Sequence, residues 1–260
     1  MMESPQIRVA MLCGNGRSSR ILYNSLATLP GVQITRVIVE NSPSALALLR
    51  GRVRKLGAAK VAGQLLFMAY NRLLSRASTR RIQQLMRGYG ISDAPFPTAN
   101  LHQVDSINTP GTIGLLAAAR PDAVIVNGTR IIAASILSAI ACPVINTHMG
   151  ITPRYRGVHG GYWALARGDR ENCGVTVHLV DPGIDTGGVL YQDTIHPDSR
   201  DNFNTYPIHQ LAKAIPLIMA ALDDVRRQQI QVRPGVLPSM LWSHPTLFEY
   251  LGNRIRYGAK

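Results

Sequence analysis

The sequence predicts an α/β protein built on a mostly parallel β-sheet that is flanked by helices. Residues 7–13 form an apolar, β-branched run that ends in a glycine-rich turn, and a helical pattern follows. Residues 34–40 form a second run of this kind, and strand and helix patterns alternate again from residue 101 onward. A strand, a glycine turn, a helix and a second strand in this order are typical of a Rossmann-like sheet.

The first predicted helix follows the turn and ends before Pro30 and Gly31. Its apolar positions are Ile21, Leu22, Leu26 and Leu29. The segment 43–92, which follows the second strand, is also predicted to be helical. Its expected apolar side consists of Val61, Leu65, Met68 and Leu73, and its expected basic side of Arg72, Arg76 and Arg80. A basic row of this kind is either a solvated face with carboxylates from elsewhere in the fold, or a surface for an anionic ligand or membrane.

The second half of the chain continues the alternation. The expected elements are strands at 101–104, 122–126, 143–146, 174–180 and 189–195, and helices at 111–120, 131–141, around Trp163 as far as Gly168, and at 203–227. Pro207 and Pro216 must start, break or kink the last helix. We expect one domain over residues 1–227, with a basic helical insertion at about 43–92, and a C-terminal extension at 228–260 that covers the core or forms a subunit contact.

Size and charge narrow the class of protein. A chain of 260 residues, of which 46% are hydrophobic and 17% charged, has the composition of a globular protein, which excludes full disorder. The net charge is +13, and residues 41–92 hold ten of the 28 basic residues and none of the acidic ones. The rest of the chain therefore has 18 basic residues against 15 acidic ones. The basic segment points to an anionic partner: a phosphate-bearing substrate, a nucleic acid or a membrane surface.

Cysteine usage and the N-terminus indicate a cytoplasmic protein. Cys13, Cys142 and Cys173 have no CxxC spacing and are expected to be reduced thiols. No cluster of cysteine and histidine has the spacing of zinc ligands, so no metal is expected. The first residues lack the basic flank and apolar core of a signal peptide, and no apolar stretch is long enough to span a membrane.

The turn after the first strand is a candidate anion site. The residues Gly14, Asn15, Gly16, Arg17 and Ser18 lead directly into a helix. Glycines allow the backbone to approach a ligand closely, and the amides at a helix N-terminus favour an anion. The motif is neither a Walker A loop nor a complete GxGxxG pattern. A tight turn without a ligand is the alternative.

Three polar side chains after predicted strands form the candidate catalytic site. Asn146 and His148 lie two residues apart, so alternation places both on one side of a strand. Asp185 lies in a glycine-rich loop after the next strand. An amide, an imidazole and a carboxylate suit acyl transfer, because they can stabilise an oxyanion and move a proton. His178, in mid-strand, is expected to be structural.

The stretch from Pro143 to Tyr191 resembles the formyltransferases that use 10-formyltetrahydrofolate. The family pattern is Asn-x-His, a Pro-x-x-x-Gly turn, Gly-Val-Thr-x-His and Asp-x-Gly-x-Asp-x-Gly. The corresponding residues are Asn146 to His148, Pro153 to Gly157, Gly174 to His178, and Asp181 to Gly187. The family includes phosphoribosylglycinamide, methionyl-tRNA and nucleotide-sugar N-formyltransferases. Outside the segment 43–92, the resemblance extends over residues 7–225.

The resemblance implies an active site of Asn146, His148 and Asp185, with His148 kept charged by Asp185. It also implies a folate pocket that is formed by Thr129, Arg130, Ile131, Ile132, Val180, Asp181, Gly183 and Ile184. The turn from Gly14 to Ser18 is similar to a phosphate-binding loop. The 10-formyltetrahydrofolate would be the co-substrate, without a metal.

The chain departs from the family pattern after the histidine. Where the family has Pro-Ser-Leu-Leu-Pro, this chain has Met149-Gly150-Ile151-Thr152-Pro153, so the serine near the amine substrate is missing. After the last strand 64 residues remain, too few for the C-terminal domain of the tRNA enzyme, so a tRNA acceptor is not expected.

The expected reaction is formyl transfer to a primary amine of a small phosphorylated acceptor, most simply an amino sugar of a nucleotide sugar. Glycinamide ribonucleotide is the second acceptor, and hydrolysis of the formylated folate is a further reaction that the same residues could perform. An anion- or membrane-binding module on a degenerate formyltransferase scaffold is the alternative outside enzymes. Peripheral contact of the segment 43–92 with a membrane or another anionic surface, and a homodimer, are left open.

Overall fold

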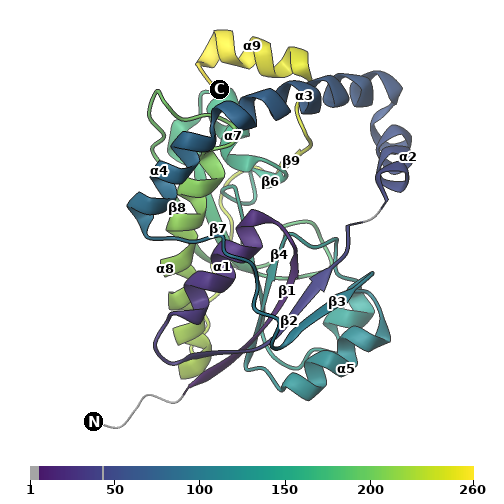
Figure 1. Ribbon diagram of the computed structural model, residues 1–260, viewed down its shortest axis with the longest axis vertical. Coiled ribbons are helices and arrows are strands. Elements are labelled where there is room, and N and C mark those ends of the chain that lie inside the picture. Colours follow the sequence, from purple (N-terminus) through teal and green to yellow (C-terminus); the bar gives the residue numbers. More distant parts are fainter. Residues whose placement is uncertain (1–5, 43) are drawn as a thin grey trace.

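The computed structural model describes residues 6–42 and 44–260 (Figure 1). Residues 1–5, on which the signal-peptide argument partly rests, and residue 43, where the predicted insertion starts, lie outside it. The strands of the main sheet are β1 (Ile7–Gly14), β2 (Val32–Glu40), β3 (Leu101–Val104), β4 (Ala123–Asn127), β5 (Val144–His148), β7 (Gly174–Leu179) and β8 (Val189–Thr194). Their order is β3-β2-β1-β4-β5-β7-β8, and all neighbours are parallel except those of β7. The predicted α/β class with a mostly parallel sheet is confirmed.

The strand order reverses between β1 and β4. From β1 the chain proceeds outward to β2 and β3, and then returns to β4 and proceeds the other way. In open α/β sheets, ligands bind beyond the carboxyl ends of the strands at such a reversal. Asn146 and His148 lie at the carboxyl end of β5, which pairs with β4, and the loop after β4 lines the same cavity.

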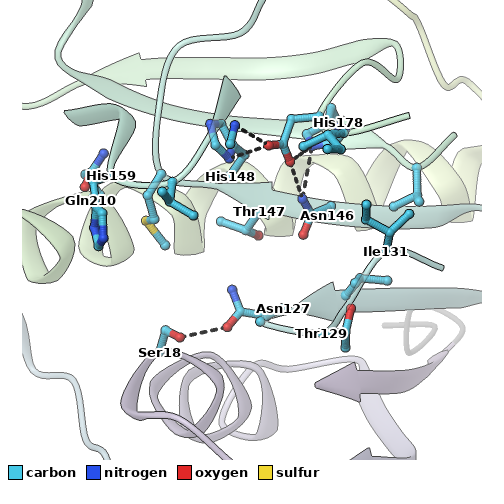
Figure 2. A pocket seen from close by; sticks show the side chains of 18 of the residues that line it. Ser18, Asn127, Thr129, Ile131, Asn146, Thr147, His148, His159, His178 and Gln210 are labelled. Carbon is cyan, nitrogen blue, oxygen red and sulfur yellow. Dashed lines mark hydrogen bonds and ion pairs between the residues drawn. The ribbon is translucent and has the colours of Figure 1, made fainter. Parts of the chain in front are cut away.

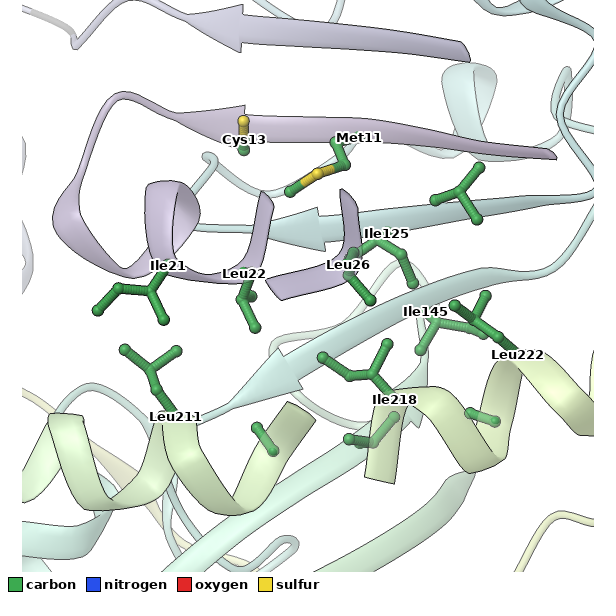
Figure 3. Close-up of a cluster of buried hydrophobic side chains, with 14 of the residues drawn as sticks. Met11, Cys13, Ile21, Leu22, Leu26, Ile125, Ile145, Leu211, Ile218 and Leu222 are labelled. Atoms are coloured by element: carbon green, nitrogen blue, oxygen red, sulfur yellow. The ribbon is translucent and has the colours of Figure 1, made fainter. Parts of the chain in front are cut away.

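Helices cover both faces of the sheet. On one face, α1 (Arg17–Ala27) and α8 (Tyr206–Arg227) pack their apolar rows against β1, β4 and β5 (Figure 3). On the other face, α5 (Pro110–Ala119) and α6 (Ala134–Leu137) form a smaller cluster with residues of β1, β2 and β4. Pro207 lies in the first turn of α8, where its missing N–H costs nothing, and Pro216 lies inside the helix.

The segment after β2 forms three helices, α2 (Ala45–Leu56), α3 (Ala58–Ala77) and α4 (Thr79–Tyr89). Ile82, Leu85 and Met86 of α4 belong to the core beneath α8, so α4 is part of the main domain. Phe67 of α3 belongs to a second core, which it forms with α7 (Gly160–Ala166), Phe203 and the C-terminal helix α9 (Leu247–Tyr257).

Two expectations for these segments are wrong. On α3, Leu65, Met68 and Leu73 are exposed, and the side that packs inward contains Gly63, Gln64 and Phe67. The expected basic row also ends at Arg76, because α3 ends at Ala77 and Arg80 belongs to α4.

The expected helix at 131–141 is reduced to α6. Asn108 is the reason, because its side chain donates a hydrogen bond to the Ile131 carbonyl and accepts one from the Ala133 N–H. These bonds hold residues 131–133 in an irregular conformation and delay the start of the helix.

The C-terminal extension covers the core. Tyr250 of α9 has no exposed surface and contacts the ring of Phe67. Upstream of α9, β9 (Leu241–Trp242) pairs with β6 (Arg156–Gly157) in a second, two-stranded sheet. A short 3-10 turn, Arg170–Asn172, precedes β7. Among residues 6–42 and 44–260, no helix is both long enough and apolar enough to cross a membrane.

Candidate active site

A cavity of about 530 Å³ lies at the carboxyl ends of β4 and β5 (Figure 2). Its lining includes Asn146, His148 and Asp185, which the sequence analysis singled out as catalytic. It also includes all of the residues expected around the folate: Thr129, Arg130, Ile131, Ile132, Val180, Asp181, Gly183 and Ile184. From the candidate phosphate turn, Ser18 lines the cavity, whereas Gly14, Asn15, Gly16 and Arg17 are not part of its wall.

Two adjacent strands bring Asn146, His148 and His178 together. Asn146 and His148 alternate on β5, and the antiparallel β7 places His178 directly opposite Asn146. The Asn146 amide nitrogen is 3.1 Å from His178 Nε2 and donates a 3.4 Å hydrogen bond to Asp185 Oδ1. Figure 2 shows this nitrogen turned toward His178 and the amide oxygen turned toward the cavity. His178 therefore belongs to the site, and the expectation that it is only structural is wrong.

Asp185 is held from three directions. Its Oδ2 accepts a 2.8 Å hydrogen bond from the Gly157 N–H and lies 3.2 Å from His148 Nδ1. Arg156 anchors the same loop, because its guanidinium donates to the Ile184 carbonyl at 3.0 Å. Asp185 adopts a left-handed backbone conformation with φ 50°, which aspartate tolerates better than most residues. The turn that contains β6 thus fixes the carboxylate.

The loop closes on itself before Asp185. Asp181 accepts hydrogen bonds from the Gly183 N–H at 3.0 Å and from the Thr186 hydroxyl at 2.7 Å. A side chain on residue 183 would collide with Thr186, so the glycine is required by this closure. The Asp181 side chain therefore shapes the loop, while the loop as a whole forms one wall of the cavity.

Asp185 is a carboxylate at neutral pH. Burial alone would raise its pKa, but the neighbouring His178 and His148 rings and the Gly157 N–H outweigh burial, and its pKa is lowered. Burial lowers the pKa of His148, against the opposing effects of Asp185 and the Tyr155 carbonyl. The two ring nitrogens of His148 nevertheless face two acceptors, Asp185 Oδ2 and the Tyr155 carbonyl, so the expectation that Asp185 keeps this ring charged stays a prediction.

The opposite wall is apolar and rigid. Ile131 is 55% exposed although it lines the cavity, and Ile184 across from it is also exposed. The loop that carries Ile131 is fixed by Glu40, whose carboxylate accepts from the Arg130 N–H at 2.9 Å and pairs with the Arg130 guanidinium at 2.6 Å. Arg130 is thus an anchor of this loop. Accessible aliphatic side chains beside fixed backbone groups suit a flat heterocycle such as a pterin.

The glycine at position 14, in the turn after β1, is required by the close packing of two loops. A side chain on residue 14 would lie 2.7 Å from the Gly128 carbonyl, so the two loops meet closely there. Arg17 turns away to Asp93 at 3.0 Å. Ser18 alone reaches the cavity, where its hydroxyl bonds to the Asn127 side chain at 2.9 Å.

Gly150 occupies the position of the missing serine. A Cβ there would lie 2.9 Å from His148 Nε2 and 3.0 Å from the Gly160 Cα. The N-terminus of α7 fills the space in which a serine side chain would stand. Contacts to an acceptor amine at this point must come from other residues.

Several cavity residues were missed by the sequence analysis. The end of β4 contributes Asn127, α7 contributes Tyr162, and α8 contributes Tyr206 and Gln210. His159 also lines the cavity, and its Nε2 is 2.9 Å from His244 Nδ1 of the C-terminal extension. The Asn-Gly dipeptide that ends β4 was visible in the sequence as a turn and was the available signal. Within residues 6–42 and 44–260, no group of three or more His, Cys, Asp or Glu side chains could hold a metal ion.

The comparisons with known proteins point to one family. The formyl transferase family model matches residues 70–214. A methionyl-tRNA formyltransferase of Thermodesulfovibrio yellowstonii is 30% identical over 135 residues, which are 52% of this chain and 44% of that protein. The chain matches less than half the length of each of the curated relatives in the comparison.

Solved structures show the same fold at low identity. A 4-N formyltransferase from Francisella tularensis has a TM-score of 0.57 and 13% identity, covering 95% of this chain and 78% of that one. A phosphoribosylglycinamide formyltransferase from Anaplasma phagocytophilum has a TM-score of 0.57 and 17% identity, covering 90% and 93%.

Proposed function

From the premise that the chain belongs to the formyl transferase family, we propose that it transfers a formyl group from 10-formyltetrahydrofolate to a primary amine. The acceptor is a small phosphorylated molecule, an amino sugar of a nucleotide sugar. The observation that carries this proposal is the convergence of Asn146, His148 and Asp185 on one cavity of about 530 Å³. That volume lies within the usual range for sites that bind small molecules.

The folate is proposed to bind between the loops at 129–132 and 180–185. Ile131 and Ile184 are exposed there, and a bound pterin would cover both side chains. Because Glu40 and Asn108 hold the first loop through its backbone, the pocket is formed before the ligand arrives. A rigid pocket reduces the ordering cost of binding.

The amine would attack the formyl carbon, and negative charge would develop on the formyl oxygen. Asn146 would donate a hydrogen bond to this oxygen after a half-turn of its amide, which exchanges the nitrogen and the oxygen. His178 Nε2, 3.1 Å away, would then donate to the amide oxygen when the ring carries a proton on this nitrogen in addition to the Nδ1 proton that bonds to the Leu179 carbonyl. One such donor contributes about 10²–10³ in rate.

One proton must leave the amine and reach the folate nitrogen when its bond to the formyl carbon breaks. The Asp185 and His148 pair would carry this proton, through water on the substrate side. Both ring nitrogens of His148 face acceptors, Asp185 Oδ2 and the Tyr155 carbonyl. A neutral ring donates to one acceptor only, so an added proton would complete the second hydrogen bond.

The choice of a phosphorylated acceptor rests on Ser18 and the start of α1. The helix begins at Arg17, and the Ser18 hydroxyl in its first turn donates to the Asn127 side chain at the end of β4. The amides at a helix N-terminus favour an anion. Glycinamide ribonucleotide shares this phosphate chemistry and is the second acceptor, and hydrolysis of the formylated folate would need water in place of the amine.

The test is to incubate the purified protein with 10-formyltetrahydrofolate and a panel of acceptors, and to measure free tetrahydrofolate. The panel contains amino-sugar nucleotides, glycinamide ribonucleotide, free amino acids, initiator methionyl-tRNA and a reaction without acceptor. We expect turnover with an amino-sugar nucleotide. Release of formate without an acceptor would instead identify a hydrolase.

Matched variants separate catalysis from binding. His148→Ala and Asp185→Asn should abolish turnover while folate binding, measured by calorimetry, persists. Asp193→Asn removes a partly exposed carboxylate that pairs with Lys213 outside the cavity, and it should act as the wild type. Near-normal turnover in His148→Ala would refute the assignment. A wild type that neither turns over nor binds folate would indicate a scaffold that has lost catalysis.

A further inference from the structure

The helices α2 and α3 carry an unusual set of side chains on their outer surface. No residue of α2 is buried, and its apolar positions Leu46, Leu49, Val53 and Leu56 recur at helical spacing. On α3, Leu66 and Leu73 are seven residues apart and therefore lie on one side of the helix. They are 51% and 63% exposed. Large aliphatic side chains in such rows are costly to leave in water.

The basic residues of these helices have no acidic partners. In the part of the chain that the structure describes, Arg50, Arg54, Lys55, Arg72 and Arg76 form no ion pair. Arg81 of α4 differs, because it pairs with Asp198 and Asp201. The explanation that the rest of the fold supplies carboxylates therefore holds for α4 and fails for α2 and α3.

The two sets of residues are interleaved on the same helices. Arg72 and Arg76 flank Leu73 on α3, and Arg50 and Arg54 alternate with the apolar positions of α2. In Figure 1, α2 extends from the body of the protein beyond the end of α3, and α9 lies alongside α3 with the exposed Phe248 and Ile255. We call the exposed residues of α2 and α3 the docking surface.

We propose that the docking surface binds reversibly to a lipid bilayer that contains anionic headgroups. Amphipathic helices with Arg and Lys on one side and Leu on the other lie in the interface of a bilayer, with the apolar side chains inserted. A bilayer accounts for both sets of residues: acyl chains cover the leucines, and the headgroups neutralise the arginines. A nucleic acid would account for the charge alone, since the side chains between the arginines are aliphatic and provide no stacking surface.

The test measures binding of the whole protein to vesicles by flotation. One set consists of equal parts of phosphatidylglycerol and phosphatidylcholine, and the other of phosphatidylcholine alone. We expect binding to the anionic vesicles, weakening as salt is raised, and none to the neutral ones. Arg50→Gln and Arg54→Gln should each weaken binding about fivefold. Leu66→Ser and Leu73→Ser should each weaken it about tenfold.

Matched controls lie elsewhere on the surface. Arg227→Gln removes an exposed charge from the end of α8, and Val236→Ser an exposed apolar side chain from the extension; both should bind as the wild type. All six positions are exposed or unpaired, so the midpoint temperature of thermal unfolding should change by no more than a few degrees in each variant.

Three outcomes would overturn the proposal. Equal binding of the wild type and the variants to anionic vesicles would show that the docking surface does not contribute to membrane binding. RNA that displaces the vesicles and binds the Leu66→Ser and Leu73→Ser proteins undiminished would assign the surface to nucleic acid. A wild-type dimer that becomes a monomer in these two variants, without vesicle binding, would assign it to a second copy of the chain.

Discussion

Among the residues of the cavity, His178 has the least obvious role. It approaches Asn146 at 3.1 Å and Asp185 at 3.7 Å, and its other nitrogen bonds to the Leu179 carbonyl. It therefore orients the amide and lowers the pKa of the carboxylate from behind the site. It acts through its neighbours and is a positioning residue.

His178→Leu should lower kcat by about ten- to a hundredfold, the usual effect of a lost hydrogen bond to a charged group. The Asp185 pKa should rise without the neighbouring His178 ring, so the acid limb of the pH–kcat profile should move to higher pH. KM for the folate should change little. A profile of unchanged shape would contradict this role, and partial recovery in His178→Gln would support it.

The spacing of Asn146 and His148, and the glycines around Asp185, made these three residues predictable from the sequence. His178 was not predictable in the same way. Its place opposite Asn146 depends on the antiparallel pairing of β5 and β7, and neither strand encodes the direction of its neighbour. The lowered pKa of His148 is caused by burial, which is likewise a property of the assembled fold.

Helix α3 shows why the pattern of one element can mislead. The packed side contains Gly63, which allows Thr246 to approach, and Gln64, whose amide donates to the His244 carbonyl at 2.7 Å. Because a small residue and a polar residue form this contact, the spacing of hydrophobic residues predicted the wrong side of α3 to be buried. The strands of the main sheet and the helices α1 and α8 were predicted closely, because their apolar rows belong to the core of the sheet, whereas the short strands β6 and β9 were not predicted.

Tyr250 is the centre of the contact between α9 and α3. Tyr250→Ala should lower the free energy of unfolding by about 3–5 kcal/mol, because it leaves a cavity beside Phe67. Within the described residues, the Tyr250 hydroxyl is buried without a hydrogen-bond partner. Tyr250→Phe is therefore the matched control and should be neutral or slightly stabilising. Urea unfolding measures both, and equal losses in the two variants would refute this account of the contact.

The stability of the whole molecule should fall in mild acid. Burial lowers the pKa of His159 to about 3 and that of His244 to about 4. Below the ordinary histidine pKa of 6.5, the unfolded chain binds protons that the folded chain does not, so the free energy of unfolding decreases as the pH falls. Each group contributes up to about 1.4 kcal/mol per pH unit. The pKa values of Asp185 and Asp201 are lowered from 3.8, so these two residues affect the free energy of unfolding only near and below pH 3.8.

Urea unfolding between about pH 7.5 and about pH 5 checks this expectation, since the slope with pH reports the difference in bound protons. The double variant His159→Asn and His244→Gln should have a flatter slope. Asparagine suits the left-handed conformation of residue 159, which has φ 59°. An identical slope in the double variant would show that residues other than His159 and His244 cause the loss of stability in acid.

The second core has a consequence for the order of events during synthesis. Gln64 and His244, which bond across it, are 180 residues apart in the chain. The ribosome therefore synthesises α3 long before α9. Until α9 has been made, Phe67 of α3 lacks its contact with Tyr250. Contacts this distant close late, because the loop between them must first be ordered. Helix α9 thus completes the second core only after all strands of the main sheet have been translated.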